Sequence, residues 1–316
     1  MPTDRTTSDK PAFSRKSSPQ KEGTLLFIDT NIWLSFYRME TEAGLSLLRR
    51  VESISDQIIV CPQVEMEFKK NRQTVIKETI GKLQVTSISR PGIFSESKAA
   101  KAVKRNIDRV KALLGQMNTR LERILEDPAA NDPVFKIFQR VYHKEDAISL
   151  DREDPVRRHI RSKALKRFLQ GYPPRKNSDN SIGDAMNWEW IIHCAQKKKS
   201  DVVLVSADGD YGMTYKNKTY LNDHLKQEFN ERVSSKRQLF LYTKLSEALK
   251  QFQIDATKPE KDEENRILAS VRDNKVEELN SPPNDGLKKI MAYIQATRKI
   301  PAGILDPEEE MDEGCY

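Results

Sequence analysis

Gly-Thr-Leu-Leu-Phe-Ile-Asp-Thr-Asn, residues 23–31, gives the clearest strand signal of the chain. Leu25 to Ile28 form a short, unbroken apolar run, which is typical of a strand buried on both faces of a parallel sheet. The run ends at Asp29, and ligands of open α/β sheets bind beyond the carboxyl ends of the strands. Asp29 is therefore a candidate functional carboxylate, or it caps the helix that follows, a role that Asp fills well.

A second apolar run, residues 201–205, also ends in acidic residues, in the stretch Ser-Ala-Asp-Gly-Asp at positions 206–210. Two more carboxylates, Glu67 and Asp184, stand near the starts of predicted helices. In a parallel sheet, strand ends and the helix starts that follow them meet at one edge. We therefore expect Asp29, Glu67, Asp184 and Asp208 to gather at that edge.

A cluster of four carboxylates favours a bound cation. The charges repel one another and raise each other's pKa values, and a divalent ion relieves that repulsion. Ligation by oxygen alone favours Mg²⁺ or Mn²⁺ over Zn²⁺, and the histidines at positions 143, 193 and 224 lack zinc-ligand spacing. A Mg²⁺ ion bound in this way keeps waters, one of which can attack a phosphoryl group.

The chain has 316 residues and a formal net charge of +7, but the charge is uneven. Residues 251–316 hold 9 Lys+Arg against 15 Asp+Glu, which leaves 45 against 32, a net charge of +13, for residues 1–250. A basic body suggests a polyanionic partner, most simply nucleic acid, although a solvated lysine-rich surface has the same composition.

The sequence predicts a cytoplasmic protein without a membrane partner. No apolar run is long enough for a membrane helix, and the first residues lack the apolar core of a secretory signal. Cys61, Cys194 and Cys315 show no paired spacing, so we expect reduced thiols.

Strands alternate with helices, which predicts an α/β fold with a doubly wound parallel sheet. Further strands are expected at residues 57–61 and 238–242, and helices at 32–51, from Pro62 onward, 182–198, 221–232 and 245–252. The domain is expected at residues 23–250, after a disordered N-terminus (1–22) and before an acidic appendage (251–316) with a helix at 287–297 in a flexible tail.

A helical insertion packed as hairpins is expected at about residues 95–170. Its first helix, 98–125, carries apolar residues at alternating spacings of four and three: Val103, Ile107, Val110, Leu114, Met117, Leu121 and Ile124. Helices follow at 133–143 and 155–170, the last rich in Arg and Lys. Their basic faces either cover a nucleic-acid groove or form a solvated bundle surface.

Four short motifs in this order resemble those of PIN-domain nucleases, the PilT N-terminus superfamily. They are Phe-Ile-Asp-Thr-Asn (27–31), Pro-Gln-Val-Glu-Met-Glu-Phe (62–68), Gly-Asp-Ala (183–185) and Ser-Ala-Asp-Gly-Asp-Tyr (206–211). In the second motif the acid precedes an apolar residue, which selects Glu67 over Glu65. Pro-Pro-Arg-Lys (173–176) followed by Gly-Asp-Ala-x-x-Trp-Glu-Trp looks like a bacterial PIN-like branch with a helical insertion.

The resemblance implies a metal-dependent endonuclease, a phosphodiester hydrolase that usually acts on single-stranded RNA. Carried over by position, the metal ligands and catalytic acids are Asp29, Glu67, Asp184 and Asp208, with Asp210 as an accessory acid. Thr30, Asn31 and Ser206 would orient ligands and water.

Basic and polar residues near these motifs are candidates for phosphate contacts. They are Arg175, Lys176, Asn71 and Arg72, for which surface or salt-bridging roles are the alternative.

Other functions use similar sequence signals. A structure-specific DNA nuclease related to flap endonucleases has similar chemistry, and the basic insertion could imitate its helical arch. A PIN-like RNA-binding scaffold without catalysis usually lacks some of the acids, which are all present here. A phosphotransferase of the haloacid-dehalogenase kind needs a second acid two residues after the first, where this chain has Asn31. The resemblance favours RNA over DNA, DNA stays open, and a protein regulator or a homo-oligomer is also left open.

Overall fold

A computed structural model describes residues 23–82, 93, 96–144, 155–175, 181–216 and 218–280, with side chains up to residue 270 except that of Lys82. The chain divides into two compact units, Met1–Ile267 and Leu268–Tyr316. The predicted helix at 287–297, the tail after it and residues 1–22 lie outside the described residues. No helix in the described ranges combines the length and the apolar character that crossing a membrane requires.

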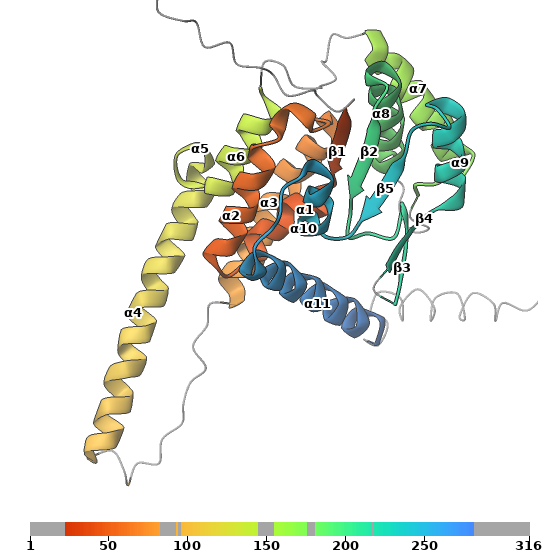
Figure 1. The fold of residues 1–316 in the computed structure, drawn as a ribbon. Helices are drawn as coiled ribbons and strands as arrows, with labels where there is room; N and C mark the ends of the chain where they lie inside the picture. Colours follow the sequence, from red (N-terminus) through yellow and green to blue (C-terminus); the bar gives the residue numbers. More distant parts are fainter. Residues whose placement is uncertain are drawn as a thin grey trace, which may run out of the picture. The chain divides into compact units, whose positions relative to one another are not determined.

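A parallel sheet forms the centre of the first unit (Figure 1). Its strands are β1 (Thr24–Ile28), β2 (Asp201–Val205) and β5 (Leu239–Tyr242), in the order β1-β2-β5. Thr24 is in register with Asp201, and Val202 with Leu239. Apart from their first residues, β1 and β2 are buried throughout, as their apolar runs predict. The α/β fold with a parallel sheet is therefore confirmed.

The strand expected at residues 57–61 is reduced to one parallel bridge, between Leu26 and Ile58. The short helix η2 (Ser55–Gln57) ends directly before it, and α3 (Pro62–Lys82) begins directly after it. Only a few extended residues remain between these helices, so a longer ladder cannot form. The amide of Ile59 still donates to the carbonyl of Leu26 at 2.8 Å.

Helices cover both faces of the sheet. α8 (Gly183–Lys198) and α10 (Leu245–Ala248) both contact β2, and Figure 1 shows α10 in front of the strands and α8 behind them. After α10 the chain continues as the short helix η4 (Leu249–Phe252). The sheet is thus enclosed by helices, as a doubly wound fold requires.

The single helix predicted at 32–51 is three helices in the structure: α1 (Thr30–Ser35), η1 (Phe36–Arg38) and α2 (Glu42–Glu52). The break has a distant cause. Glu263, in the first turns of α11 (Lys258–Asn280), accepts a 2.6 Å hydrogen bond from the amide of Glu40. That amide is therefore unavailable for a helical hydrogen bond.

The start of α11 is anchored by buried carboxylates. Glu260 accepts from Arg50 Nε at 2.9 Å and from Ser46 Oγ at 2.7 Å. Glu264 accepts from the amides of Leu245 and Ser246 at the start of α10. The first compact unit accordingly extends to Ile267.

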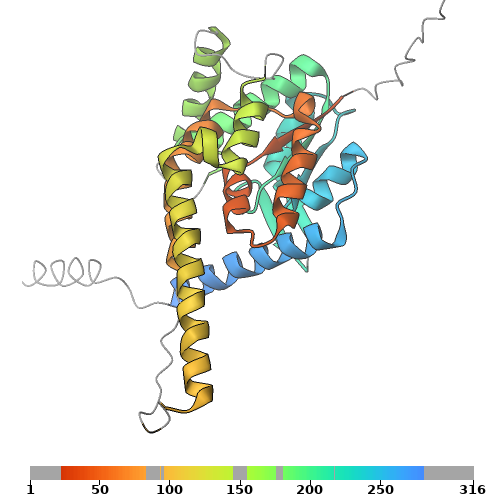
Figure 2. The same ribbon diagram turned by 90° about the vertical axis from the view of Figure 1, so that its left-hand side faces the viewer.

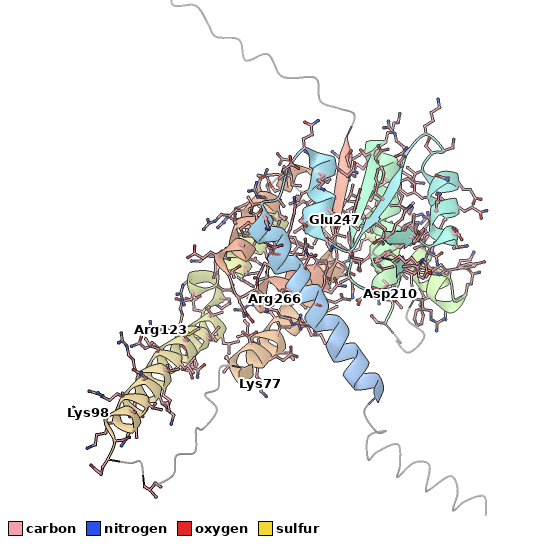
Figure 3. All side chains as sticks on the ribbon, turned by 60° about the horizontal axis from the view of Figure 1, so that its bottom comes forward. Lys77, Lys98, Arg123, Asp210, Glu247 and Arg266 are labelled. Carbon is pink, nitrogen blue, oxygen red and sulfur yellow. The ribbon has the colours of Figure 1, made fainter. Side chains whose placement is uncertain are left out.

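The insertion contains α4 (Lys98–Glu126), α5 (Pro128–Asn131), α6 (Pro133–Tyr142) and α7 (Pro155–Leu169). α6 is buried on one face and supplies aromatic rings to the core. α4 is one long uninterrupted helix (Figure 2), and Lys98 and Arg123 lie toward its two ends (Figure 3). Not one of its residues is buried. The hairpin packing expected of the insertion therefore buries no residue of α4.

An antiparallel hairpin, β3 (Gly212–Tyr215) and β4 (Lys218–Leu221), was not predicted. The helix expected from residue 221 begins after it, as α9 (Asp223–Arg232). Asn222 caps α9 by accepting from the amide of His224 at 3.0 Å. The hairpin connects the acidic end of β2 with α9.

Candidate functional site

The candidate site lies at the carboxyl edge of the sheet. Here the hydrogen bonds between strands continue one residue beyond the ends of β1 and β2. The amide of Asp29 donates to the carbonyl of Val205 at 2.9 Å, and the amide of Ser206 donates to the carbonyl of Tyr242 at 3.0 Å. Asp29 and Ser206 are thereby held side by side at the carboxyl edge. The Ser206 hydroxyl donates a 2.6 Å hydrogen bond to Asp29 Oδ2.

Asp29 is both an edge residue and the N-cap of α1. Its Oδ1 accepts from the amide of Thr30 at 2.7 Å, and its Oδ2 also accepts from Asn31 Nδ2 at 3.0 Å. The side chain is 6 % exposed. Burial, together with the charges of Asp208 and Glu67, raises the pKa of Asp29 to about 6, although hydrogen bonds from Ser206 and Thr30 lower it. The negative charge at this edge is therefore poorly compensated.

Glu67, on the second turn of α3, faces the same edge. Its Oε2 accepts from the Thr30 hydroxyl at 2.8 Å, and its Oε1 accepts from Gln63 Nε2 at 2.7 Å. Glu65 behaves differently: its carboxylate pairs with Lys69 at 2.6 Å and lies 3.0 Å from His143 Nε2. The two acids of the motif thus have separate surroundings, and it is Glu67 that contacts the end of β1.

The start of α8 lies against Glu67. A Cβ atom at Gly183 would be 2.6 Å from Glu67 Oε1 and 2.8 Å from Gln63 Nε2. Only a glycine leaves these two side chains in place. Asp184 follows in the first turn of α8 and is half-buried. Asp184 therefore directly follows the residue that packs against Glu67.

The fourth motif folds back over the end of β2. The amide of Asp208 donates to Ser206 Oγ at 3.2 Å, and the amide of Ala207 donates to Asn31 Oδ1 at 3.2 Å. These contacts connect the turn to both strand ends. Asp208 and Asp210 are both half-buried.

Tyr211 is fully buried beneath these acids. Its ring packs against Phe27 with centroids 6.4 Å apart. Burial raises the pKa of Tyr211 well above its usual value, and the charges of Asp29, Asp184 and Asp210 act in the same direction. Carboxylates from three segments of the chain are therefore close enough to influence one phenol group. Figure 3 labels Asp210 at this place.

The candidate phosphate contacts fall in different places. Arg72 is 3 % exposed and forms a 2.7 Å ion pair with buried Asp132, so it cannot present its guanidinium to a ligand. This corrects its expected role to a structural one. Asn71 and Arg175 are exposed, and Arg175 lies over the Phe168 ring at 4.7 Å. Lys176 lies outside the described residues.

The candidate acids are not arranged as a complete set of metal ligands in the described part of the chain. In the described ranges, no group of three or more His, Cys, Asp or Glu side chains is close enough to hold an ion as it stands. The donor set nevertheless fits a hard cation, since it consists of carboxylates and hydroxyls and its most buried member has a raised pKa. Binding would require the half-buried acids to turn toward Asp29.

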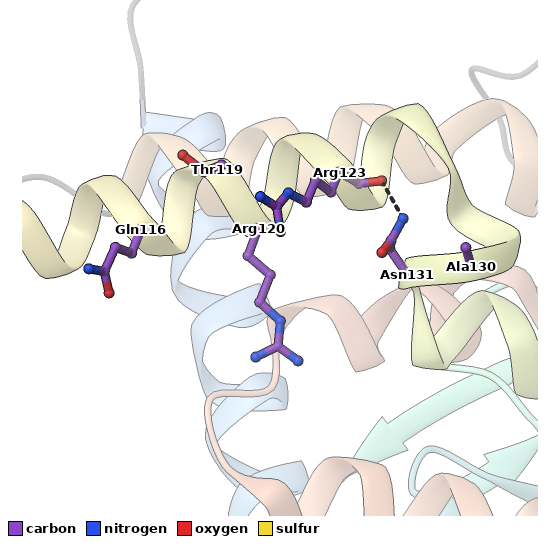
Figure 4. A pocket seen from close by; sticks show the side chains of 6 residues that line it. All are labelled: Gln116, Thr119, Arg120, Arg123, Ala130 and Asn131. Carbon is purple, nitrogen blue, oxygen red and sulfur yellow. Dashed lines mark hydrogen bonds between the residues drawn. The ribbon is translucent and has the colours of Figure 1, made fainter.

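A pocket elsewhere does not involve these acids. It lies on α4 and α5 and is lined by Gln116, Thr119, Arg120, Arg123, Ala130 and Asn131 (Figure 4). Within it, Asn131 Nδ2 donates to the carbonyl of Arg123 at 3.3 Å. The pocket is a feature of the insertion.

Two residues that support the acids lie in the quoted motifs but were given no role from the sequence. Gln63 binds Glu67, and Gly183 leaves room for both side chains. The helical spacing of four between Gln63 and Glu67 is the signal that could have identified the first.

Comparison with models of protein families identifies the family of the chain. A family model described as PIN domain matches residues 26–211, which is more than half of the chain. The matched range begins in β1 and ends at Tyr211, so it contains all five acids. No curated protein and no solved structure matches the chain.

Proposed function

The chain belongs to the PIN-domain family, whose members are in general nucleases, and we propose that it is a metal-dependent endonuclease that hydrolyses phosphodiester bonds in single-stranded RNA. The family gives the broad class of activity, acting on nucleic acid. The metal, the substrate and the roles of individual residues are our proposal.

The observation that supports it best is the state of Asp29. This carboxylate is buried at the carboxyl edge of a parallel sheet, where ligands of such folds bind. Its pKa is raised by burial and then by two further acids from distant segments, Asp208 and Glu67. A purely structural cap would not need these neighbours, whereas a divalent cation would compensate all three charges.

In this proposal Asp29, Glu67, Asp184 and Asp208 hold Mg²⁺ or Mn²⁺, and Asp210 is an accessory acid. A bound ion of this kind supplies charge stabilisation at a phosphoryl oxygen and an acidified water. The chain itself orients the ligands. Ser206 and the Thr30 amide fix the two oxygens of Asp29, while the Thr30 hydroxyl and Gln63 fix those of Glu67.

The net charge of the chain and its free thiols support the proposed substrate and compartment. The net charge of +13 over residues 1–250 suits a polyanionic substrate. Arg175 and Asn71 are exposed and stay as proposed phosphate contacts, together with Lys176. Cys61 and Cys194 are buried free thiols, which supports a reducing compartment, and we propose the cytoplasm.

The test is cleavage of end-labelled single-stranded RNA and DNA of one sequence, with Mn²⁺, Mg²⁺ or EDTA. Wild type should cut RNA only with a metal, and Asp29→Asn should not cut. Glu67→Gln and Glu65→Gln form a matched pair, because both acids lie on α3 but only Glu67 contacts Thr30. We expect loss of cleavage in the first variant and near-normal cleavage in the second.

Other outcomes would contradict parts of the proposal. Cleavage of DNA instead of RNA would indicate a flap-type nuclease. Binding of RNA without any cleavage, and without a requirement for Mn²⁺, would indicate a catalytically silent scaffold. Equal effects of the two glutamate variants would exclude the assigned role of Glu67.

A further inference from the structure

The β3–β4 hairpin is attached directly to the acidic edge. It begins one residue after Tyr211 and two after Asp210, and the amide of Asn222 at its far end donates to the carbonyl of Tyr211 at 2.9 Å. Both ends of the hairpin are therefore held at the backbone of Tyr211. Any ligand that reaches the acids is close to the hairpin's attachment point.

One face of the hairpin packs inward. A Cβ atom at Gly212 would be 2.1 Å from the carbonyl oxygen of Tyr220 and 2.8 Å from Leu241 on β5. β4 also contacts β5. The side of the hairpin that carries Gly212 and Leu221 is thus directed to the protein, which fixes the other side toward solvent.

The outer face is formed by Met213, Tyr215, Lys218 and Tyr220. Met213 pairs with Tyr220 and Tyr215 with Lys218, and directly opposed residues share a face, as do residues two apart on one strand. The exposed fractions are large for such side chains: 61 % for Met213, 57 % for Tyr215 and 44 % for Tyr220. Two aromatic rings and a thioether are therefore presented together to solvent.

Lysine side chains accompany both rings. Lys216 Nζ lies 5.4 Å from the centre of the Tyr215 ring, and Lys218 Nζ lies 5.4 Å from the centre of the Tyr220 ring. A partner for this face must offer flat apolar surface to the rings and negative charge to the ammonium groups. Unpaired nucleotides have both, since every base has a free π-face and every phosphate a charge.

We propose that this outer face binds single-stranded nucleic acid by stacking bases on Tyr215 and Tyr220. The proposal rests on the nuclease function proposed above and adds to it a reason for selecting unpaired strands. In a duplex the bases are stacked on one another, so their faces are closed to the rings. Lys216 and Lys218 neutralise phosphates between the stacked bases.

The experiment measures binding separately from cleavage. Fluorescence anisotropy with a labelled twelve-nucleotide oligouridine, in EDTA, reports affinity for the full chain. Replacing both rings, Tyr215→Ala with Tyr220→Ala, should weaken binding by roughly 30-fold or more, given the usual contribution of stacking for each of two bases. Tyr215→Phe with Tyr220→Phe keeps the rings and should restore the affinity. Thr214→Ala, on the opposite side of β3, is the matched control and should bind as wild type.

Two further probes separate stacking from charge. An abasic oligonucleotide of the same length should bind wild type and the double alanine variant equally, because it has no bases to stack. Lys216→Gln with Lys218→Gln should lower the slope of log affinity against log salt by about 1.4, or 0.7 per lost phosphate contact on a single strand. Unchanged affinity of the double alanine variant for oligouridine would overturn the proposal and leave this face to a protein partner.

The stacking proposal and the nuclease proposal can be contradicted independently of each other. If wild type cleaves RNA and the double alanine variant binds and cleaves equally well, the stacking surface is excluded and the nuclease stands. If neither wild type nor any variant cleaves RNA, but binding depends on the two rings, the stacking proposal stands and the nuclease proposal is excluded.

Discussion

The hydroxyl of Ser206 donates a 2.6 Å hydrogen bond to Oδ2 of Asp29, across 177 residues of sequence. The bond joins the ends of two adjacent parallel strands, and each partner is also held by a backbone hydrogen bond from its own amide. The position of the most buried acid is therefore set by the sheet. A site fixed in this way can keep its geometry while its charges change.

Asp29→Asn should stabilise the fold at high pH. In EDTA, the folded wild type retains the Asp29 proton up to about pH 6, whereas the unfolded chain loses it near pH 3.8. The fold therefore loses stability as pH rises through this window. The raised pKa of Asp29 corresponds to a loss of at most about 3 kcal/mol in the stability of wild type at high pH. Asp29→Asn avoids this loss, but the hydrogen bonds that it loses offset about 1 kcal/mol of the gain.

Urea unfolding of both proteins at pH 5 and pH 8 measures this effect. The free energy of unfolding of Asp29→Asn, relative to that of wild type, should be about 1 kcal/mol higher at pH 8 than at pH 5. An equal difference at the two pH values would show that the pKa of Asp29 is not raised.

Gly183→Ala should impair the site without harming the fold. The new Cβ would overlap Glu67 Oε1, which is the end of a flexible side chain and can turn away at little cost. We expect the free energy of unfolding to change by less than about 1 kcal/mol, and the apparent affinity for Mn²⁺ to fall by about tenfold, as is usual when a ligand loses its support. Gly81→Ala, on α3 with no atom within 4 Å, is the control. Cleavage titrated with Mn²⁺ gives the readout, and identical titrations for both variants would contradict the role assigned to Gly183.

Arg72→Met should destabilise the protein by about 3 kcal/mol, because it leaves Asp132 buried without its cation. Asp132 also accepts from the amides of Val134 and Phe135 as the cap of α6, and Asn caps a helix about as well as Asp. A double-mutant cycle with Asp132→Asn in urea measures the coupling between the two side chains. RNA affinity of folded Arg72→Met should equal that of wild type. Weaker RNA binding with unchanged stability would instead restore Arg72 as a phosphate contact.

Glu189→Gln should show the opposite pH dependence to Asp29→Asn. Burial alone would raise the pKa of Glu189, but hydrogen bonds from Arg232 and Arg167 outweigh it and lower the pKa. The charged carboxylate therefore stabilises the fold above pH 4.5, and this contribution is lost as pH falls through the lower folded value. At pH 7 the variant should be less stable by about 2 kcal/mol in urea unfolding. The deficit should shrink at pH 3.5, and a constant deficit would contradict this.

The strands and site helices could be predicted because their signals are local. β2 is found at the predicted residues, and α3 and α8 begin within one residue of their predicted starts. Apolar runs, Pro62 and the acidic ends of strands depend on near neighbours. The choice of the four acids as metal ligands stays a prediction, and a parallel sheet explains why the strand ends that precede Asp29 and Asp208 lie at one edge.

What could not be predicted depends on distant contacts or weak patterns. The break after Arg38 is caused by Glu263, more than two hundred residues later. Arg72 gives the sequence signal of a surface cation, and its partner Asp132 lies in the insertion. The hairpin has two short strands with lysines and exposed rings, so no apolar alternation indicates a buried face.

The strand order of the sheet also determines when the proposed nuclease could first act during its own synthesis. β1 and Glu67 leave the ribosome first, but the neighbour of β1 in the sheet is β2, which follows the whole insertion. At typical elongation rates the delay is on the order of ten seconds. Until then Asp29 has neither Ser206 nor Asp208 beside it, so a nascent chain holds an incomplete set of acids.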